Sequence, residues 1–250
     1  MRAMMAVAAM AACVLAAAPA WAEGEAKDKW ESSVAVGANV TRGNSETMLL
    51  NGSAVTERKG GVNEFRFSLE GNYGETEVVQ ADGTEETQTN VQNAKGAATY
   101  RRLFNDRLYG ALNAELSHDD IADIDYRLIT GPAVGYYFIK SERNTLSGET
   151  GINYIKDKVG GVEDDRFALR FAERSEHKIG ASSKVWQSVE YLPTVDDFGN
   201  YLLNAEIGAE AAMTTKLSLR VVAQDKYNSE PSPGKDENDL TVIAGVSYKL

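Results

Sequence analysis

Three arginines recur at intervals of four residues, Arg166, Arg170 and Arg174. If this segment is a β-strand, its side chains alternate between two faces, so the three guanidinium groups lie along one face in steps of roughly 13 Å. Fixed charges that line a channel select ions through the field they create across it. The row is therefore a candidate determinant of ion preference.

By the same alternation, thirteen charged residues are predicted to face the interior of a barrel. They are Arg66, Glu70, Lys95, Glu115, Arg127, Glu149, Arg166, Arg170, Arg174, Glu190, Glu206, Glu210 and Arg220. Basic and acidic groups nearly cancel, and we expect Glu149 and Glu190 to flank the arginine row and Arg220 to approach Glu210. Two interpretations stay open: the charges line an aqueous pore, or they interlock and leave a closed structural barrel.

Acidic clusters form a second candidate site. The densest consists of Asp119, Asp120, Asp123 and Asp125. Such carboxylates can hold calcium or magnesium, shared with the phosphates of lipopolysaccharide. We favour a solvated, repulsive acidic surface as the explanation, and no stretch matches the twelve-residue calcium loop. We therefore expect no metal or cofactor, and keep this cluster as the alternative metal site.

An enzyme is the third class to consider. A serine hydrolase needs a serine that a histidine activates. The chain has two histidines, His118 and His177, and neither has an identifiable serine in a strained Gly-x-Ser-x-Gly turn. We expect no enzymatic activity.

Twelve alternating segments must position these residues. In the last one, every even-numbered residue from Leu240 to Leu250 is apolar. The odd-numbered residues are mostly small or polar, with Ile243 the exception. Period-two alternation predicts a strand with one apolar face. An even number of strands closes into an all-β, antiparallel up-and-down transmembrane β-barrel. The expected strands are 30–42, 45–58, 63–77, 88–102, 107–118, 124–139, 144–157, 163–177, 183–195, 200–213, 216–229 and 239–250.

Charges in the middle of the strands favour a membrane barrel over a soluble sandwich. In 63–77, Phe65, Phe67 and Leu69 would face lipid, while Arg66 and Glu70 face inward. A soluble sandwich also alternates, but its apolar face points inward against a second sheet. Charged residues in the middle of a strand can instead face a water-filled interior, so no second sheet has to cover that face.

The connections alternate in length. Turns after even-numbered strands are short, whereas the others are mostly longer and acidic, at 77–87, 118–125, 157–165 and 229–239; the turn at Gly43-Asn44 is an exception. Bacterial barrels have short periplasmic turns and longer outer loops. The pattern predicts both termini on the periplasmic side.

Aromatic residues cluster near the strand ends, as the girdles at the two membrane interfaces predict. They are Trp30, Tyr73, Tyr100, Tyr109, Tyr126, Tyr136, Tyr154, Tyr191, Tyr201, Tyr227 and Tyr248. Pro132 and Pro193 each remove a ladder donor, so each is expected at a bulge or a strand end.

The N-terminal residues 1–22 predict a secretory signal peptide. Arg2 supplies the positive charge, an apolar run follows, and Ala20-Trp21-Ala22 is a small-x-small site for cleavage after Ala22. A short polar segment, 23–29, then leads into the barrel, 30–250.

Composition narrows the class further. The net charge of −11 argues against nucleic acid as a partner. No apolar run after the signal is long enough for a transmembrane helix. Cys13 is the single cysteine, so cleavage leaves a mature chain without disulfides or thiolate metal sites; the alternative is a lipoprotein acylated at Cys13.

Three stretches resemble the salt-induced outer-membrane protein family, a DUF481-like domain of unknown function, over essentially the whole mature chain. They are Thr41-Arg42-Gly43-Asn44-Ser45, then Asp125-Tyr126-Arg127 with Gly131-Pro132-Ala133-Val134-Gly135-Tyr136-Tyr137-Phe138, and finally Tyr227-Asn228-Ser229 with Pro231, Asp239 and Gly245-Val246-Ser247-Tyr248. One departure is Leu250, where such barrels usually end in phenylalanine.

The resemblance implies a barrel in the cell outer membrane, with no catalytic residues to carry over. Expected partners are outer-membrane lipid, lipopolysaccharide and the barrel-insertion machinery, and we expect a monomer. The function expected is a narrow or gated pore, expressed under osmotic stress as the family name suggests. The alternative is an envelope-stabilising barrel whose acidic loops bind divalent cations or lipopolysaccharide.

Overall fold

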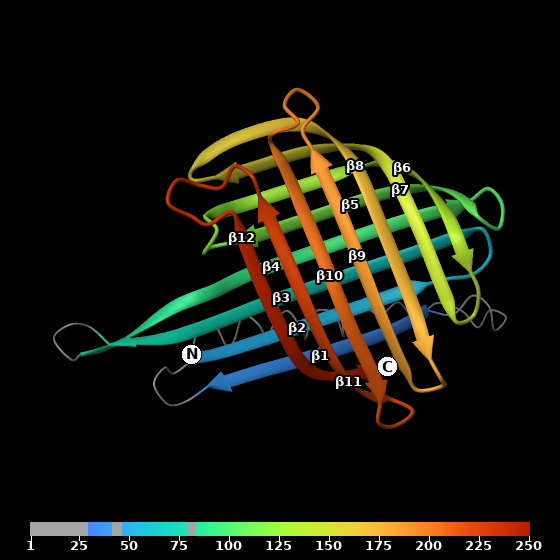
Figure 1. The fold of residues 1–250 in the computed structure, drawn as a ribbon, viewed down its shortest axis with the longest axis horizontal. Helices are drawn as coiled ribbons and strands as arrows, with labels where there is room; N and C mark the ends of the chain where they lie inside the picture. The colour runs from blue at the N-terminus through green and yellow to red at the C-terminus, as the bar shows by residue number, and fades with distance from the viewer. Residues whose placement is uncertain (1–29, 42–46, 80–83) are drawn as a thin grey trace.

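The computed structural model describes residues 30–41, 47–79 and 84–250, and these form one closed antiparallel β-barrel of twelve strands (Figure 1). Each strand pairs with its neighbours in the sequence, and β1 pairs with β12 to close the ring. This confirms the predicted all-β fold and strand number. The strands are β1 (Trp30–Thr41), β2 (Thr47–Arg58), β3 (Asn63–Val79), β4 (Glu85–Leu103), β5 (Leu108–Asp119), β6 (Ile124–Lys140), β7 (Asn144–Val159), β8 (Val162–Ile179), β9 (Ser183–Pro193), β10 (Tyr201–Ala212), β11 (Leu217–Asn228) and β12 (Asn238–Lys249).

The two ends of the barrel differ in their connections. The turn end carries the start of β1, the end of β12 and the turns that follow the even-numbered strands; the loop end carries the other connections. The hairpin of β3 and β4 extends beyond the rest of the barrel at the loop end (Figure 1). In the segment 77–87, predicted as a loop, residues 77–79 belong to β3 and 85–87 to β4, while 80–83 lie outside the described residues.

The predicted loop 157–165 is also wrong, because β7 and β8 continue through it to a tight turn at Gly160 and Gly161. Both glycines have positive φ, 60° and 78°, which other residues adopt only with strain. Across the two strands, Lys156 faces Asp165 and Lys158 faces Glu163. Opposite charges in such cross-strand pairs favour continued pairing, so charge alone did not indicate a loop.

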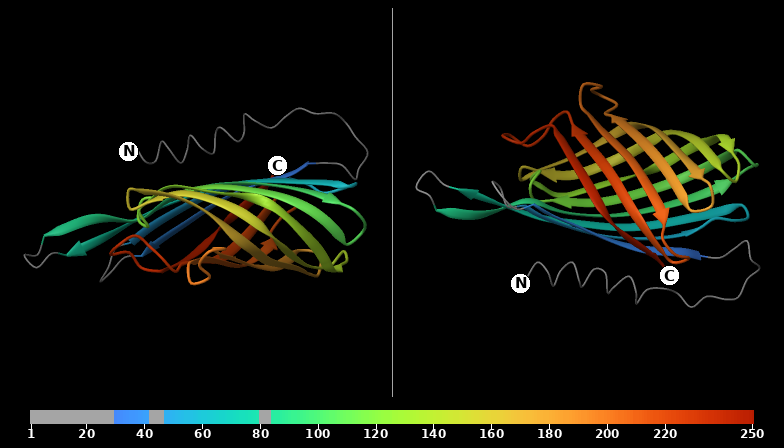
Figure 2. Two further views of the ribbon diagram at one scale, coloured as in Figure 1. Left: turned by 90° about the horizontal axis from the view of Figure 1, so that it is seen from above. Right: turned by 60° about the horizontal axis from the view of Figure 1, so that its bottom comes forward.

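The outer surface of the barrel is apolar. Phe67, Leu112 and Ile207, on three different strands, are 45%, 54% and 61% exposed. The residues next to them in the sequence point into the barrel, as the alternation predicted. Figure 2 shows the ring from two further sides, with strands tilted strongly against its axis. None of the described residues form a helix long and apolar enough to cross a membrane.

Aromatic rings form two bands on this outer surface. Near the loop end, rings follow one another from Phe171 through Tyr191 and Tyr201 to Tyr227, with centroids 5.3 to 6.5 Å apart. Near the turn end, Trp30, Phe65 and Tyr100 make a similar series. Tyr109, predicted to belong to a band, is instead fully buried inside the barrel. It lies near a strand end, but its odd number puts it on the inner face of β5.

The two prolines are accommodated differently. Pro193 is the last residue of β9, as predicted. Pro132 lies in the middle of β6, so its predicted place at a bulge or strand end is wrong. Residues 131 and 132 have no paired residue on β7, although Thr130 and Ala133 do. The missing donor of Pro132 therefore falls where the ladder is already interrupted.

The seam between β1 and β12 is short. The two strands pair over Ser33–Gly37 and Gly245–Lys249, whereas β1 pairs with β2 along its whole described length. Gly37 faces Gly245 where the pairing ends, and a Cβ on Gly245 would lie 2.3 Å from the Val36 carbonyl oxygen. Beyond this point, β1 and β12 diverge toward the loop end (Figure 1).

The seam can be tested by disulfide cross-linking in a Cys13→Ser chain. Ala35 and Ser247 face each other in the paired part, so Ala35→Cys with Ser247→Cys should form a disulfide under mild oxidation. Asn39→Cys with Ile243→Cys continues the same register beyond the paired part and should remain reduced. Mobility on non-reducing gels measures both. Equal cross-linking of the two pairs would mean that the seam is paired along its full length.

Candidate functional site

Four cavities follow one another along the inside of the barrel. The turn-end cavity, of about 340 Å³, reaches residues 214–216, and the central cavity has about 270 Å³. A bridging cavity of about 150 Å³ leads on to the loop-end cavity of about 90 Å³, which reaches residues 235–237. The series therefore runs from one end of the barrel to the other.

Successive cavities share lining residues. Arg66 and Arg174 line both the turn-end and the central cavity. Glu115 and Glu190 line the central and the bridging cavity, and Lys95 lines the bridging and the loop-end cavity. Charged side chains thus lie at each junction, and Ile129, from a buried apolar cluster, lines both the central and the loop-end cavity.

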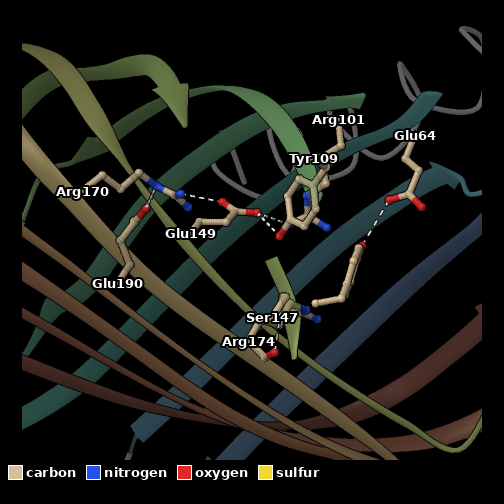
Figure 3. A network of polar contacts seen from close by, with 9 residues as sticks. Glu64, Arg101, Tyr109, Ser147, Glu149, Arg170, Arg174 and Glu190 are labelled. Carbon is tan, nitrogen blue, oxygen red and sulfur yellow. Dashed lines mark hydrogen bonds and ion pairs between the residues drawn. The ribbon is translucent and has the colours of Figure 1, made fainter. Parts of the chain in front are cut away.

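A buried carboxylate, Glu149 on β7, organises the central cavity. One of its oxygens accepts hydrogen bonds from Arg101 at 2.7 Å and from Tyr109 at 2.9 Å, and the other accepts one from Arg170 at 2.5 Å. The Nε of Arg170 donates to Glu190 at 2.7 Å. Figure 3 shows this network, which joins five strands, β4, β5, β7, β8 and β9. The guanidinium group of Arg101 also lies over the ring of Tyr109.

A second buried carboxylate, Asp157, holds two arginines nearer the loop end. Its oxygens accept from Arg127 at 2.7 Å and from Arg166 at 3.2 Å. Arg166 also contacts Asp164 at 3.2 Å. Two members of the arginine row, Arg166 and Arg170, are therefore bound to carboxylates.

On the opposite wall, uncharged donors satisfy the carboxylates. The indole N–H of Trp186 donates to Glu206 at 2.6 Å. The side-chain amide of Gln224 donates to Glu206 at 3.1 Å and to Glu70 at 3.2 Å. These bonds satisfy carboxylate oxygens without using a cation.

Arg174 and Arg220 differ from the other lumen arginines. Within the part of the chain that the structure describes, no carboxylate lies within ion-pair distance of either group. The backbone register does place Arg220 opposite Glu210, as expected, but the Glu210 carboxylate lies 3.5 Å from Lys184. The guanidinium group of Arg220 instead lies over the Trp186 ring, 5.3 Å from its centroid.

The remaining predicted charges also have definite positions inside the barrel. Arg66 pairs with Glu57 at 2.8 Å, and the Lys95 ammonium lies 4.0 Å from Glu115. Glu70 lines a small void beside the seam. The predicted residues thus occupy one polar interior, but in separate networks rather than in one continuous row.

Sequence reasoning missed several residues of these networks. Arg101 has the same parity as Lys95 on the same strand, so the alternation could have found it. Asp157 was expected at the boundary between the strand 144–157 and the loop 157–165. Tyr109 and Trp186 were not considered as polar groups, although a phenol and an indole can each donate a hydrogen bond to a buried carboxylate.

The aspartates of the predicted acidic cluster turn to separate partners. Asp119 accepts hydrogen bonds from two backbone N–H groups of the β5–β6 connection, and Asp120 contacts His118. Asp123 accepts from Ser232 at 2.9 Å, and Asp125 pairs with Lys158 at 2.6 Å. No group of three or more possible metal-binding side chains converges among the described residues.

The two histidines lie at opposite ends of the barrel. His118 is at the loop end of β5, where its Nδ1 is 2.8 Å from the Asp125 carbonyl oxygen. His177 is at the turn end of β8, beside the amide of Asn144. They cannot act on one substrate together.

Known structures share this fold at low sequence identity. The chain is similar to the NanC porin, with a TM-score of 0.52 and 13% identity, over 88% of this chain and 100% of that one. It also matches the COG4313 outer membrane channel from Pseudomonas putida F1, with a TM-score of 0.49 and 6% identity, over 92% and 100% of the two chains. A search of curated proteins finds no match. The fold places the protein in the class of closed antiparallel barrels with an apolar exterior and a polar lumen.

The family follows from the sequence itself. Residues 34–250 match the family model described as protein of unknown function, DUF481. The chain belongs to this family, as the three resembling stretches indicated.

The Glu149 network should contribute strongly to stability. Glu149→Ala would leave the positive charges of Arg101 and Arg170 buried without the negative charge of Glu149. We therefore expect the free energy of unfolding to fall by about 3–5 kcal/mol. Glu57→Ala removes a carboxylate whose partners, Arg66 and Lys59, are 42% and 60% exposed, and should cost less than about 1 kcal/mol. Urea unfolding of the barrel in detergent measures both. Similar losses for the two variants would contradict a special role for Glu149.

Proposed function

We propose that the barrel is a narrow water-filled passage across the outer membrane. The observation that carries this proposal is the series of charge-lined cavities that share residues from the turn end to the loop end. Most side chains at the junctions between the cavities are charged or polar, and water can occupy the space between such groups.

The outer surface supports the membrane location. Exposed apolar side chains surround the ring, and aromatic rings flank them near both ends. In a bilayer these rings occupy the two interfaces. The turn end, with both barrel termini, then faces the periplasm, and the projecting β3–β4 hairpin faces outward. The predicted signal peptide, cleaved after Ala22, would direct the chain to this location.

The Glu149 network makes the passage narrow. It reaches across the central cavity between Arg101 on β4 and Glu190 on β9, and holds its members with short hydrogen bonds. Only small hydrophilic solutes would pass it. The protein would bind no cofactor and catalyse no reaction; we expect a monomer in contact with outer-membrane lipid and lipopolysaccharide, inserted by the barrel-insertion machinery.

The same network favours the second candidate, a closed structural barrel. If the arginine–glutamate contacts persist at all times, they block the central cavity and leave the two ends as separate vestibules. The two candidates agree on every static feature of the wall. They differ in whether a small ion can move past Glu149.

Conductance with chemical block distinguishes the candidates. We expect discrete current steps from the purified Cys13→Ser protein in a planar bilayer. In the same background, Ser188→Cys places a thiol where the central and bridging cavities meet. A charged, water-soluble thiol reagent should reduce its current.

Ile207→Cys provides the matched control, because this side chain is 61% exposed on the apolar outer face. The reagent should leave its current unchanged. A silent bilayer that contains inserted protein would reject the pore and support the closed barrel.

A further inference from the structure

We propose that the turn-end cavity is a binding site for a small organic anion that carries a carboxylate or phosphate group, held by Arg174 and Arg220. The inference rests on the proposed function, since the anion would be a solute that enters the lumen. The site itself is reached from the turn end, so binding does not require that the central cavity be open.

The cavity has the size of a ligand site. Its volume of about 340 Å³ is the largest of the four, and lies within the usual range of roughly 300–1,000 Å³ for small-molecule pockets. Turn residues 214–216 and Lys59 form its mouth. A lone inorganic ion would leave most of this space to water, so the volume favours an organic anion.

The cavity is positive, and its carboxylates are largely occupied. Basic side chains outnumber acidic ones in its lining, which contains Lys59, Arg66, Arg174, Lys184, Lys216, Arg220 and Lys249 against Glu31, Glu57, Glu176, Glu206 and Glu210. Glu57 accepts from Lys59 and Arg66, and Glu210 pairs with Lys184. Glu206 is bound by Trp186 and Gln224. Glu206 keeps its negative charge, because both donors are neutral, but seven basic groups against five acidic ones leave the lining net positive for an incoming anion.

Arg174 stands at the inner end of this cavity. It lines both the turn-end and the central cavity, so its side chain lies where the two meet. Among the described residues, no side chain makes a hydrogen bond or ion pair with its guanidinium group. The other two arginines of the row, Arg166 and Arg170, are each held by carboxylates. Arg174 is thus the member of the row whose five N–H donors are available to a ligand.

Arg220 is held in place without using its donors. Its guanidinium group lies over the Trp186 ring, and its buried Nε has no hydrogen-bond partner. The ring is fixed in turn, because its N–H bonds Glu206 and its six-membered ring packs against Gly208, where a Cβ would lie 2.1 Å from a ring carbon. A cation preorganised by stacking loses little conformational entropy when it binds an anion.

The chemistry of two arginines defines the ligand class. A guanidinium group offers paired N–H donors that match the two oxygens of a carboxylate or phosphate, and such charge-assisted bonds are stronger than neutral ones. Neutral sugars and polyols lack this complement. The site should therefore prefer acidic solutes to neutral solutes of the same size.

Trp186 supplies a direct readout. Residues 23–250 contain two tryptophans, Trp30 and Trp186, and Trp30 lies on the outer face near the turn end. The full chain carrying Trp30→Phe would be expressed, purified from outer membranes, and checked by intact mass for removal of the leader with Trp21. Its fluorescence then reports on the cavity alone, whether or not the pore conducts.

Succinate and glycerol 3-phosphate are the probes, and glycerol is the neutral control. We expect a saturable change of Trp186 fluorescence with at least one anion and none with glycerol. Arg174→Gln and Arg220→Gln should each weaken binding by about tenfold or more, the loss of one charge-assisted contact. If Arg220→Gln does not fold, as judged by heat-modifiable gel mobility, Arg220→Lys replaces it, since lysine keeps the charge but loses the paired donors.

Arg66→Gln is the matched control, because it removes the same charge from the same cavity but its guanidinium group is already bound to Glu57. It should leave the affinity within about twofold. No saturable response, an equal response to glycerol, or an equal loss in all three arginine variants would overturn the proposal; the last result would mean general attraction to positive charge.

Bilayer recordings on the same preparation separate this inference from the pore. Conductance without anion binding would reject the site and leave the pore intact. Anion binding by a protein that is inserted but silent would reject the pore and keep the site.

Discussion

Closure of the backbone ladder is the constraint on which the rest of this structure depends. Every strand pairs on both sides, so the chain has one surface outside the ring and one inside it. In a bilayer, the outer surface must be apolar and free of unpaired backbone groups. The charged half of each alternating strand can then lie only in the lumen. The sequence of cavities and ion pairs is the consequence of placing so many charges in so small an interior.

The lumen meets this requirement by pairing charge locally. Glu149 and Asp157 each hold two arginines, and Glu206 is satisfied by an indole and an amide instead. Removing both partners of such a pair can cost little, but removing one leaves a buried charge. The lumen around Glu149 and Asp157 is therefore tied together by ion pairs. The turn-end cavity around Arg174 and Arg220 keeps positive charge that is not cancelled by contact.

Much of this arrangement could be predicted from the sequence, because a strand alternates with period two. Alternation gave the fold class, the strand number and the inward direction of Glu149 and Arg170. It could not give the partner of each charge, since cross-strand neighbours and diagonal contacts differ by only a few ångströms. Arg220 was expected beside Glu210, yet its guanidinium group lies over the Trp186 ring, and the Glu210 carboxylate lies 3.5 Å from Lys184. The loop prediction failed at residues 157–165 for a related reason. A run of charged residues indicates a solvated loop, but charges of opposite sign that face each other across two strands stabilise those strands.

The short pairing of β1 with β12 bears on the mechanics of the ring. Lateral tension in a closed hoop is carried equally around its circumference, so the hoop parts at the joint with the fewest bonds. Here that joint ends at Gly37 and Gly245, two positions without side chains to interlock. The joint also brings together the first and last strands, which are the most distant parts of the chain in sequence. The strength of this barrel under stretching of the envelope is thus set by its two terminal strands, and not by the buried ion pairs that make the opposite wall stiff.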